Sequence, residues 1–428
     1  MIKTVIMAGG KGTRIASVAS DIPKPMIPIC GKPILEHQID CLKKNGLTDI
    51  ILVIGHLGEQ IKNYFGNGSN FGCNISYFTE TEPLGTGGAL FKIENLTDNF
   101  ILLNGDIIFD MDFSRMIAFH TEKKAQVSLA VHPNNHPFDS ALIVTNSDYQ
   151  IIDWINKEDE RTIYKNLVNA GVHIISVEFL KNCKQEKEKV DLDRDMLKPF
   201  IKHGNIYGYI TPEYIKDMGT PDRFSQVGKA IEDGIVGQKN LSNKQKCIFL
   251  DRDGTINTLN DFITKPESLE LLDGVTEAIK KINALGYLAI VITNQPVIAR
   301  GEVDFETLDL IHMKMETDLG ECGAFIDGLF YCPHHPDRGF PGELPEFKID
   351  CDCRKPKPGM ILKAAEKYNI DLSQSYMVGD DIRDAKAGIA AGCVPVLLRD
   401  NAGKSEISEE GNKISLFSCL ADFVESCL

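Results

Sequence analysis

The chain has 428 residues, 43% of them hydrophobic and 25% charged, which excludes a disordered, collagen-like or coiled-coil protein and allows two or three domains. Its 46 basic and 61 acidic side chains give a formal net charge of −15, which argues against a dedicated nucleic-acid-binding protein. No apolar run approaches the roughly 18 residues that cross a bilayer, and the N-terminal apolar stretch is too short for a signal peptide. We therefore expect a cytoplasmic chain with mostly reduced cysteines and neither a nucleic-acid nor a membrane partner.

Short β-branched runs alternate with longer helical patterns, which predicts α/β architecture. The first half of the chain contains five expected strands, at residues 4–7, 50–54, 100–103, 127–131 and 172–175. A polar stretch at 232–246 predicts a linker, and a second alternation then begins with a strand at 247–250, a helix near 274–285 and a strand at 287–292. We expect two Rossmann-like domains at 1–235 and 247–428, joined by a linker at 236–246.

The first expected strand runs into a glycine-rich loop, Ala8-Gly9-Gly10-Lys11-Gly12-Thr13-Arg14. Glycines after a strand let backbone N–H groups approach a phosphate closely. The spacing fits neither a Walker A loop nor a Rossmann dinucleotide fingerprint. Lys24 follows between Pro23 and Pro25, and the two prolines leave it little backbone freedom. The pattern indicates a phosphate-binding loop with a fixed lysine nearby.

These two motifs together resemble the sugar-1-phosphate nucleotidyltransferases, which make an NDP-sugar from an NTP and a sugar 1-phosphate. Four later segments extend the resemblance over roughly residues 1–230: 83–89, 103–106, 169–171 and 217–221. The resemblance implies a mixed sheet of the GT-A-like kind. The sequence after Arg14 and the segment Leu103-Asn104-Gly105-Asp106 are similar to the D-glycero-α-D-manno-heptose 1-phosphate guanylyltransferases. That similarity implies GTP as the nucleotide.

The resemblance also implies a role for each matching residue. Arg14 and Lys24 are the expected catalytic cations, since charge develops on the phosphate oxygens during in-line attack. Asp106 and Asp217 are the expected ligands of Mg²⁺, which prefers oxygen. The sugar phosphate is expected to contact Lys157, Asn169 and Gly171. The expected nucleotide-binding residues are Ala8, Gly9, Gly10, Gly12, Thr13, Gly85, Thr86, Gly87 and Asp106.

The strand at 247–250 ends in Asp251-Arg252-Asp253-Gly254-Thr255, which resembles the haloacid dehalogenase-like phosphatases and implies a parallel sheet. Alternation along an extended chain predicts that the two carboxylates, two residues apart, point into one cleft. By resemblance, Asp251 attacks phosphorus to form an aspartyl-phosphate. Asp253 then protonates the leaving oxygen and later activates water.

Three later segments supply the rest of the expected phosphatase site. Thr293, at a strand end, is placed to bond the phosphoryl oxygen, and Asn294 beside it to bind substrate. Lys355 is expected to neutralise the nucleophile, with Lys357 as an alternative. Asp380 is the expected Mg²⁺ ligand together with Asp251 and Asp253, because carboxylates that crowd a phosphate need a cation. The outer partners of that ion are expected to be Asp381 and Asp384.

Three cysteines and one histidine lie close in sequence between these segments. Cys332 and His334 precede a loop at 335–350, and Cys351 and Cys353 follow it. Three thiolates and an imidazole fit tetrahedral Zn²⁺ with no open position, which predicts a structural zinc site. His335 is an alternative ligand to His334. Because Cys353 directly precedes Arg354 and Lys355, zinc is expected to fix the loop that carries the catalytic lysine.

A zinc loop of this kind resembles the D,D-heptose 1,7-bisphosphate 7-phosphatases, and the histidinol-phosphate phosphatases share the pattern. Arg300 and Arg354 are the expected holders of a distal phosphate. A 7-phosphatase yields heptose 1-phosphate, the expected substrate of the first domain, so the hypothesis is a bifunctional enzyme that uses GTP and heptose phosphates. The alternatives are a mannose or glucose 1-phosphate nucleotidyltransferase fused to a histidinol-phosphate-type phosphatase, and a non-catalytic nucleotide-sugar sensor. The sequence leaves the oligomeric state open.

Overall fold

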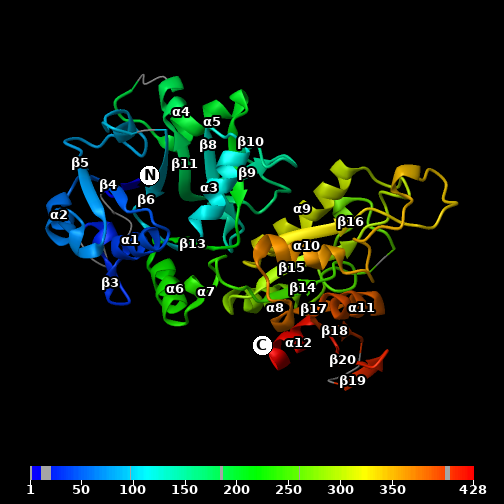
Figure 1. Cartoon of the computed structure of the whole chain (residues 1–428). Coiled ribbons are helices and arrows are strands. Elements are labelled where there is room, and N and C mark those ends of the chain that lie inside the picture. The colour runs from blue at the N-terminus through cyan, green and yellow to red at the C-terminus, as the bar shows by residue number, and fades with distance from the viewer. Residues whose placement is uncertain (1, 11–20, 97, 184–186, 260, 401–404) are drawn as a thin grey trace. The chain divides into compact units, whose positions relative to one another are not determined.

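Two large β-sheets organise the described part of the chain, one in each unit (Figure 1). The computed structural model describes residues 2–10, 21–96, 98–183, 187–259, 261–400 and 405–428. Unit 1 comprises Met1–His132, Ile143–Ile155 and Val168–Asn240. Unit 2 comprises Pro133–Leu142, Asn156–Leu167 and Leu241–Leu428. The predicted site residues Gly12, Thr13 and Arg14 lie outside the described ranges.

The sheet of unit 1 is mixed, as predicted. Its order is β10-β9-β11-β6-β1-β4-β5, and β8 pairs with both β11 and β12. β1, β4, β5 and β6 run parallel, whereas β11 runs antiparallel to β6 and β8. The strands of the first half are β1 (Lys3–Met7), β2 (Pro28–Ile29), β3 (Lys32–Pro33), β4 (Asp49–Ile54), β5 (Asn74–Thr79), β6 (Asn99–Asn104), β7 (Ile107–Asp110), β8 (Val127–His132), β9 (Leu142–Thr145), β10 (Ile151–Ile155), β11 (Val168–Ser176), β12 (Ile206–Ile210) and β13 (Tyr214–Asp217). The five strands predicted for this half are confirmed.

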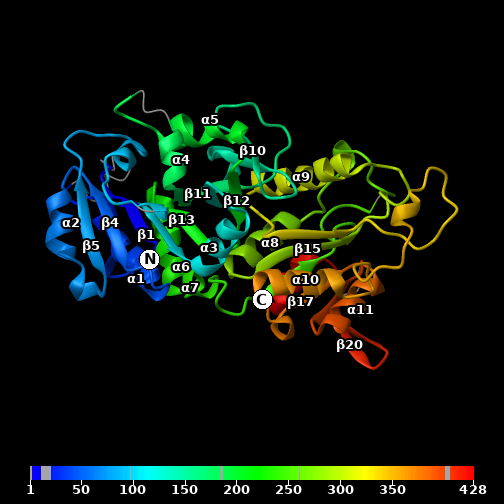
Figure 2. The same ribbon diagram turned by 45° about the horizontal axis from the view of Figure 1, so that its top comes forward.

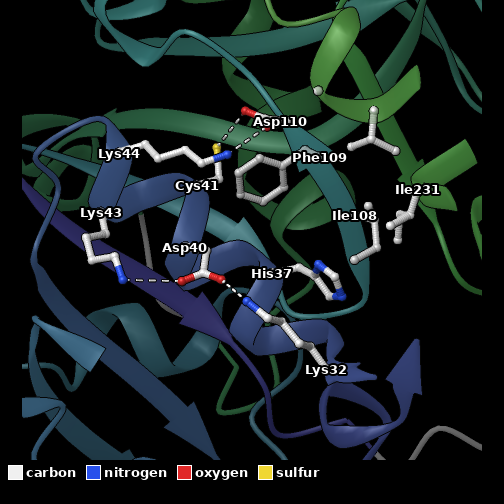
Figure 3. Close-up of a pocket in the computed structure, with 12 residues that line it drawn as sticks. Lys32, His37, Asp40, Cys41, Lys43, Lys44, Ile108, Phe109, Asp110 and Ile231 are labelled. Atoms are coloured by element: carbon white, nitrogen blue, oxygen red, sulfur yellow. Dashed lines mark hydrogen bonds and ion pairs between the residues drawn. The ribbon is translucent and has the colours of Figure 1, made fainter. Parts of the chain in front are cut away.

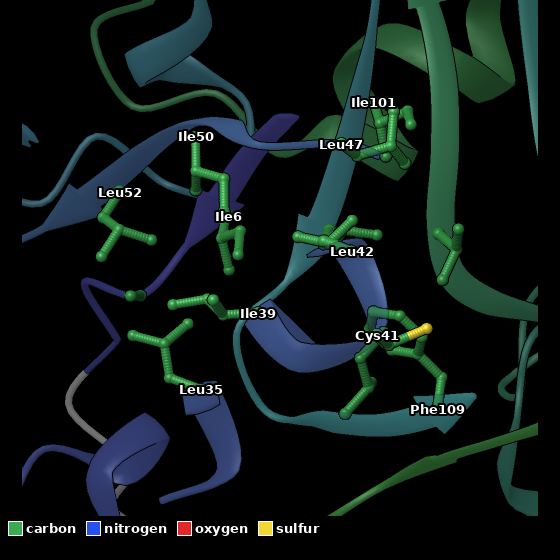
Figure 4. Close-up of a cluster of buried hydrophobic side chains, with 14 of the residues drawn as sticks. Ile6, Leu35, Ile39, Cys41, Leu42, Leu47, Ile50, Leu52, Ile101 and Phe109 are labelled. Atoms are coloured by element: carbon green, nitrogen blue, oxygen red, sulfur yellow. The ribbon is translucent and has the colours of Figure 1, made fainter. Parts of the chain in front are cut away.

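Helix α1 shows how sequence periodicity builds the core of unit 1. Its apolar residues Leu35, Ile39 and Leu42 recur at helical spacing and pack against Ile6 and Ile101 of the sheet (Figure 4). Each such buried side chain contributes roughly 1.5–3 kcal/mol. The helices of this half are α1 (Ile34–Lys44), α2 (Gly58–Phe65), α3 (Phe113–Glu122), α4 (Val177–Asn182), α5 (Lys198–Phe200), α6 (Pro221–Glu232) and α7 (Ile235–Gln238).

The sheet of unit 2 has the order β16-β15-β14-β17-β18-β20-β19. The predicted parallel sheet is confirmed for all pairs except the edge hairpin β19–β20, which is antiparallel. Its strands are β14 (Cys247–Leu250), β15 (Leu288–Asn294), β16 (Gly328–Cys332), β17 (Tyr376–Gly379), β18 (Val394–Leu398), β19 (Ser405–Glu409) and β20 (Asn412–Phe417). Its helices are α8 (Val275–Ala284), α9 (Phe305–Glu321), α10 (Gly359–Tyr368), α11 (Ile382–Ala391) and α12 (Leu420–Cys427).

Helices cover both faces of this second sheet, as Figure 2 shows. Ile248 and Leu250 of β14 pack in one cluster with α8, α9 and α12, whereas Cys247 and Phe249 pack in another with α10 and α11. Because alternate residues of a strand point to opposite faces, both sets must be apolar, which explains the unbroken apolar run before Asp251. None of the helices in the described ranges is long and apolar enough to cross a membrane.

Two features of the chain path go beyond the sequence prediction. The stretch predicted as a polar linker contains α7, and Asn240 after it donates from Nδ2 to Asp110 Oδ1 at 2.7 Å. Unit 2 also takes in two segments that precede its main body in sequence. In one of them the Tyr164 amide donates to Thr317 Oγ1 and the Asn166 amide to Glu316 Oε2, both at 2.9 Å. These segments therefore pack along α9 as part of unit 2.

Candidate active sites

Three carboxylates meet at the carboxyl ends of two neighbouring strands in unit 2. β14 and β17 pair in parallel, so Asp251 and Asp380, which follow them, lie at the same edge of the sheet. Asp384, on the first turn of α11, completes a group whose ligand atoms lie within 4.8 Å of one another. Gly254 has a φ of +78°, and a Cβ there would lie 2.3 Å from Asp380 Oδ2, so only glycine fits. Such an all-oxygen set suits a hard divalent cation.

Lys355 is the cation of this cluster. Its Nζ lies 2.8 Å from Asp251 Oδ1 and 2.6 Å from Asp384 Oδ1, and it donates to the Ile292 carbonyl at 2.8 Å. Asn294 holds the backbone of Lys355, because its side chain accepts from the Lys355 amide at 3.0 Å and donates to the Lys355 carbonyl at 3.1 Å. Lys357 is instead partly exposed and pairs with Asp350 at 2.7 Å. The structure thus brings Lys355, and not Lys357, to Asp251.

Burial and charge set the protonation of these groups. Burial and then the Asp384 carboxylate raise the pKa of Asp251 above its ordinary value, although Lys355 opposes them. Burial and then Asp251 raise the pKa of Asp380 to about 6. Burial alone would lower the pKa of Lys355, but Asp251 and Asp384 raise it, so the amine stays charged. The crowded carboxylates favour a further cation beside Lys355.

Asp253 lies outside this group of three and is held by a second set of donors. The buried Arg252 guanidinium donates from Nη2 to both carboxylate oxygens of Asp253, at 2.9 and 3.0 Å. Asn257 Nδ2 donates to Oδ1 at 3.0 Å and Gln295 Nε2 to Oδ2 at 2.8 Å. Gln295 Nε2 also donates to Thr293 Oγ1 at 2.9 Å. The sequence prediction missed these three donors, although Gln295 follows Thr293 by the two-residue spacing that keeps strand side chains on one side.

The predicted zinc ligands form a compact cluster. The Sγ atoms of Cys332, Cys351 and Cys353 lie 3.2–3.5 Å apart, and His334 Nδ1 lies 3.4 Å from Cys353 Sγ. These separations are too long for a disulfide and fit four ligands around one ion. His335 Nδ1 instead accepts the Asp337 amide at 3.2 Å, so the structure brings His334 rather than His335 to the cluster.

The two arginines predicted for a distal phosphate lie beside these elements. Arg354 Nη1 donates to the His334 carbonyl at 3.0 Å, which ties the residue before Lys355 to the Cys/His cluster. The Arg300 guanidinium lies over the ring of Phe262 and over that of Phe340, at 4.3 Å from each ring centre. Both arginines are thus held by the zinc loop or its neighbours.

In unit 1 the structure brings Lys24, Asp106 and Asp217 together. Lys24 Nζ lies 2.5 Å from Asp106 Oδ2. β13 pairs antiparallel with β7 so that Asp217 faces Ile107, and the Met218 amide donates to the Asp106 carbonyl at 2.9 Å. Arg223 Nη1, which the sequence did not indicate, donates to both oxygens of Asp217 at 2.9 and 3.0 Å. Two carboxylates paired with two cations make this edge a candidate site for phosphates and a divalent cation.

The predicted nucleotide loops are each tied to neighbouring backbone. Ala8 is buried, its amide donates to the Val53 carbonyl at 2.8 Å, and Gly9 and Gly10 continue from it. The loop that carries Gly85, Thr86 and Gly87 is anchored on a later segment. Thr86 Oγ1 accepts the Leu192 amide at 2.8 Å, and the Gly87 amide donates to the Val190 carbonyl at 2.9 Å. The loop is therefore anchored by the segment at 190–192.

The three residues predicted to contact the sugar phosphate do not share one unit. Asn169 and Gly171 lie in β11 of unit 1, where Asn169 Oδ1 accepts the Gly171 amide at 3.1 Å. Asn169 Nδ2 also donates to Asp193 Oδ1 at 3.3 Å, and burial and then Asp191 raise the pKa of Asp193 to about 7. Lys157 is exposed and belongs to a segment of unit 2.

A cavity of about 510 Å³ in unit 1 was not predicted (Figure 3). Its lysines are already in ion pairs: Lys32 and Lys43 with Asp40, and Lys44 with Asp110. The predicted site residues are absent from its described lining, which consists of Lys32, His37, Asp40, Cys41, Lys43, Lys44, Ile108, Phe109, Asp110, Ile231, Val236 and Gly237. We assign no ligand to it.

Two family models match the chain. The nucleotidyl transferase model matches residues 3–234 and a haloacid dehalogenase hydrolase-like model matches residues 352–418. Since the first covers more than half of the sequence, the chain belongs to the nucleotidyl transferase family.

Named relatives match each part. The D-glycero-beta-D-manno-heptose-1,7-bisphosphate 7-phosphatase of Salmonella typhi is 42% identical over 187 residues, which span 42% of this chain and 95% of the relative. The D-glycero-alpha-D-manno-heptose 1-phosphate guanylyltransferase of Aneurinibacillus thermoaerophilus is 34% identical over 233 residues, which span 54% of this chain and 99% of the relative. The crystal structure of HddC from Yersinia pseudotuberculosis is 26% identical, covers 54% of this chain and 100% of its own, and has a TM-score of 0.47. The chain is thus a fusion of homologues of a heptose bisphosphate phosphatase and a heptose 1-phosphate guanylyltransferase.

Proposed function

We propose that the chain is a bifunctional enzyme of GDP-heptose biosynthesis. It removes the 7-phosphate from D-glycero-α-D-manno-heptose 1,7-bisphosphate and then transfers guanylyl from GTP to the heptose 1-phosphate. The products are GDP-D-glycero-α-D-manno-heptose and pyrophosphate. One observation carries this proposal: the chain spans 95% of a phosphatase and 99% of a guanylyltransferase. The phosphatase is named for heptose 1,7-bisphosphate and the guanylyltransferase for heptose 1-phosphate.

The anomer follows from the transferase half. The phosphatase relative is named for the β-anomer and the transferase relative for the α-anomer. Hydrolysis at C7 leaves the C1 configuration unchanged, so a fused pair that works in sequence must use one anomer throughout. Transfer at C1 depends on that configuration directly, and we therefore assign the α-anomer to both steps. Parallel assays with the α- and β-bisphosphates test this assignment.

In the phosphatase step Asp251 attacks phosphorus, and the bond to the sugar O7 breaks as Asp253 gives that oxygen a proton. Water then attacks the aspartyl-phosphate while Asp253 takes a proton from it, which regenerates both residues. Lys355 offsets the negative charge at Asp251, and Arg252 with Gln295 orients Asp253. Asp251, Asp380 and Asp384 fit Mg²⁺, which would neutralise the phosphoryl oxygens when bound.

In the transferase step an oxygen of the sugar 1-phosphate attacks the α-phosphorus of GTP and pyrophosphate leaves. Lys24 and the backbone amides of Gly9 and Gly10 bind and orient the nucleotide phosphates. Asp106 and Asp217 would hold Mg²⁺, which offsets charge on those phosphates. Arg14 is the proposed second phosphate-binding cation, and Asn169 and Gly171 the proposed sugar contacts.

We further propose that Cys332, His334, Cys351 and Cys353 hold a structural Zn²⁺, because all four positions of a tetrahedral ion are filled by protein atoms. Metal analysis of the purified protein should find one zinc per chain. The proposed domains are 1–235 and 247–428, which limited proteolysis would test.

The central experiment supplies the α-bisphosphate, GTP and Mg²⁺ to the purified chain and detects the GDP-sugar. Asp251→Asn is expected to abolish phosphate release yet spare transfer from supplied heptose 1-phosphate. Asp217→Asn is expected to abolish guanylyl transfer and to spare phosphate release. Failure to form GDP-heptose, with turnover of mannose 1-phosphate or histidinol phosphate instead, would overturn the proposal.

A further inference from the structure

Arg223 pairs with one of the proposed metal ligands of the transferase site. Its Nη1 donates to both carboxylate oxygens of Asp217, at 2.9 and 3.0 Å. Only 19% of the Arg223 side chain is exposed, against 38% of that of Asp217, so water screens the pair only in part. Because Asp217 would bind Mg²⁺ through these same oxygens, the guanidinium and the ion compete for them.

The turn between β13 and α6 brings Arg223 onto this carboxylate. β13 ends at Asp217 and α6 begins at Pro221. Thr220 caps the helix, and its Oγ1 accepts the Arg223 amide at 3.3 Å. The Gly219 amide donates to Asp217 Oδ1 at 2.8 Å, and a Cβ on Gly219 would lie 2.6 Å from that oxygen. A residue without a side chain at 219 therefore lets the carboxylate meet the first turn of α6.

The other proposed metal ligand is paired with a cation in the same way. Lys24 Nζ lies 2.5 Å from Asp106 Oδ2, and 12% of the lysine side chain is exposed. The Met218 amide donates to the Asp106 carbonyl at 2.9 Å, which ties the two ion pairs together. The two carboxylates and two cations cancel in formal charge. A divalent cation on the carboxylates would therefore leave both Lys24 and Arg223 able to face the negative phosphates of the reactants.

Lys216 is the nearest basic residue along the strand, and it is directed elsewhere. It directly precedes Asp217 on β13, and its Nζ donates to Gln226 Oε1 at 2.7 Å. Neighbouring residues of a strand point to opposite faces, so the two side chains separate. Arg223 comes instead from the helix that follows the strand. The two residues therefore carry the same charge close to Asp217, but only Arg223 binds its carboxylate.

We propose that Arg223 is a further phosphate-binding residue of the transferase step, which exchanges the Asp217 carboxylate for a phosphate group of the reactants when a divalent cation binds there. This inference rests on the proposed transferase function. A guanidinium donates to a carboxylate and to a phosphate with the same planar set of N–H groups, so one acceptor can replace the other. Arg223 thus opposes binding of the metal alone and favours binding of the metal together with phosphate.

The first test measures the affinity for Mn²⁺ in the absence of nucleotide, by electron paramagnetic resonance of the free ion. It uses the full chain with Asp380→Asn, which removes the phosphatase site from the titration. Arg223→Gln is expected to bind Mn²⁺ about 3- to 10-fold more tightly, because the ion no longer competes with a guanidinium. Arg223→Lys keeps the charge without the planar set of donors and should lie between the two.

The second test measures guanylyl transfer in chains with an unaltered phosphatase site. Arg223→Gln is expected to lower the transferase kcat/KM about 10- to 100-fold, with partial rescue in Arg223→Lys. A loss confined to GTP assigns the nucleotide phosphates as the acceptor, and a loss confined to heptose 1-phosphate assigns the sugar phosphate. Phosphate release from the bisphosphate on the same sample should stay unchanged and reports that the chain is folded.

Lys216→Gln is the matched control, because it removes the same charge beside Asp217 without removing a hydrogen bond to it. An equal effect of Lys216→Gln means that net charge alone acts, and overturns the inference. Weaker Mn²⁺ binding by Arg223→Gln also overturns it, since Arg223 would then only orient the metal ligand. A wild type that transfers guanylyl to no sugar 1-phosphate refutes the proposed function itself. An active wild type, with unchanged Mn²⁺ affinity in Arg223→Gln, refutes this inference alone.

Discussion

Replacement of Lys355 by methionine tests the phosphatase site most directly. Methionine keeps the buried stem of the lysine and removes only its charge. In the wild type, Nζ lies 2.8 Å from Asp251 and 2.6 Å from Asp384, and only 3% of the side chain is exposed. The variant therefore leaves two buried carboxylates without their cation. We expect loss of both phosphatase activity and stability of unit 2.

The expected loss of stability follows from the burial of this ion pair. Removal of one partner from a buried ion pair costs about 3–5 kcal/mol. For a unit of this size each kcal/mol lowers the melting temperature by about 2–4 °C, so we expect unit 2 to melt about 6–20 °C lower. The phosphatase kcat should fall about 10²–10³-fold, as for loss of one preorganised group that stabilises transition-state charge. Mg²⁺ should raise the melting temperature of Lys355→Met more than that of the wild type, because it replaces the missing positive charge.

The assay measures phosphate release from the bisphosphate and, on the same sample, GDP-heptose formation from supplied heptose 1-phosphate. The second activity should stay intact and reports that the rest of the chain is folded. Lys357→Met is the matched control, since Lys357 makes a surface ion pair with Asp350, worth at most about 1 kcal/mol. If Lys357→Met abolishes phosphate release while Lys355→Met keeps it, the assignment of the catalytic lysine is wrong.

Three further outcomes are expected. Cys353→Ser should lose the zinc and at least about tenfold of the phosphatase activity, with transfer unchanged, as measured by metal analysis and the paired assays. Asp217→Asn should lower the transferase kcat about 10²–10³-fold and make heptose 1-phosphate accumulate, which chromatography detects. Burial lowers the pKa of His120 to about 4, so the folded state of unit 1 binds this proton less tightly than the unfolded state. Its stability should therefore fall as pH drops from about 6.5 to about 4, by up to about 3 kcal/mol, and His120→Gln should flatten that dependence in pH-resolved melting curves.

Elements whose residues lie close together in the sequence could be predicted from the sequence alone. An apolar run that ends in a carboxylate, as before Asp251 and Asp380, predicts a buried parallel strand and the end at which its candidate site residues lie. The cluster of Cys332, His334, Cys351 and Cys353 was likewise predicted, because C-x-H and C-x-C pairs need only one loop to bring them together. Neither inference required knowledge of which distant strands pair.

Residues whose partners come from other segments could not be found in this way. Arg223 and Asp217 are six residues apart, but the pair depends on how α6 leaves β13. Lys157 was placed with Asn169 by motif order alone, whereas its segment belongs to unit 2 because Tyr164 and Asn166 bond to α9. The order of the motifs did not indicate that the segment between β10 and β11, two strands of the unit 1 sheet, belongs to unit 2.

The second carboxylate of the Asp-x-Asp motif shows why side-chain direction is the hardest part to predict. Alternation places residues 251 and 253 on one side only while the chain remains extended, and β14 ends at Leu250. Beyond that point the amides of Thr255, Ile256 and Asn257 all donate to the Arg252 carbonyl, so the chain turns. The turn lets Arg252 fold back onto Asp253, and the proposed nucleophile and the proposed acid have separate partners: Lys355 for Asp251, and Arg252 and Gln295 for Asp253. The turn therefore separates the two carboxylates, with Asp251 beside Lys355 and Asp253 beside Arg252 and Gln295, and the spacing of the motif alone could not predict either set of partners.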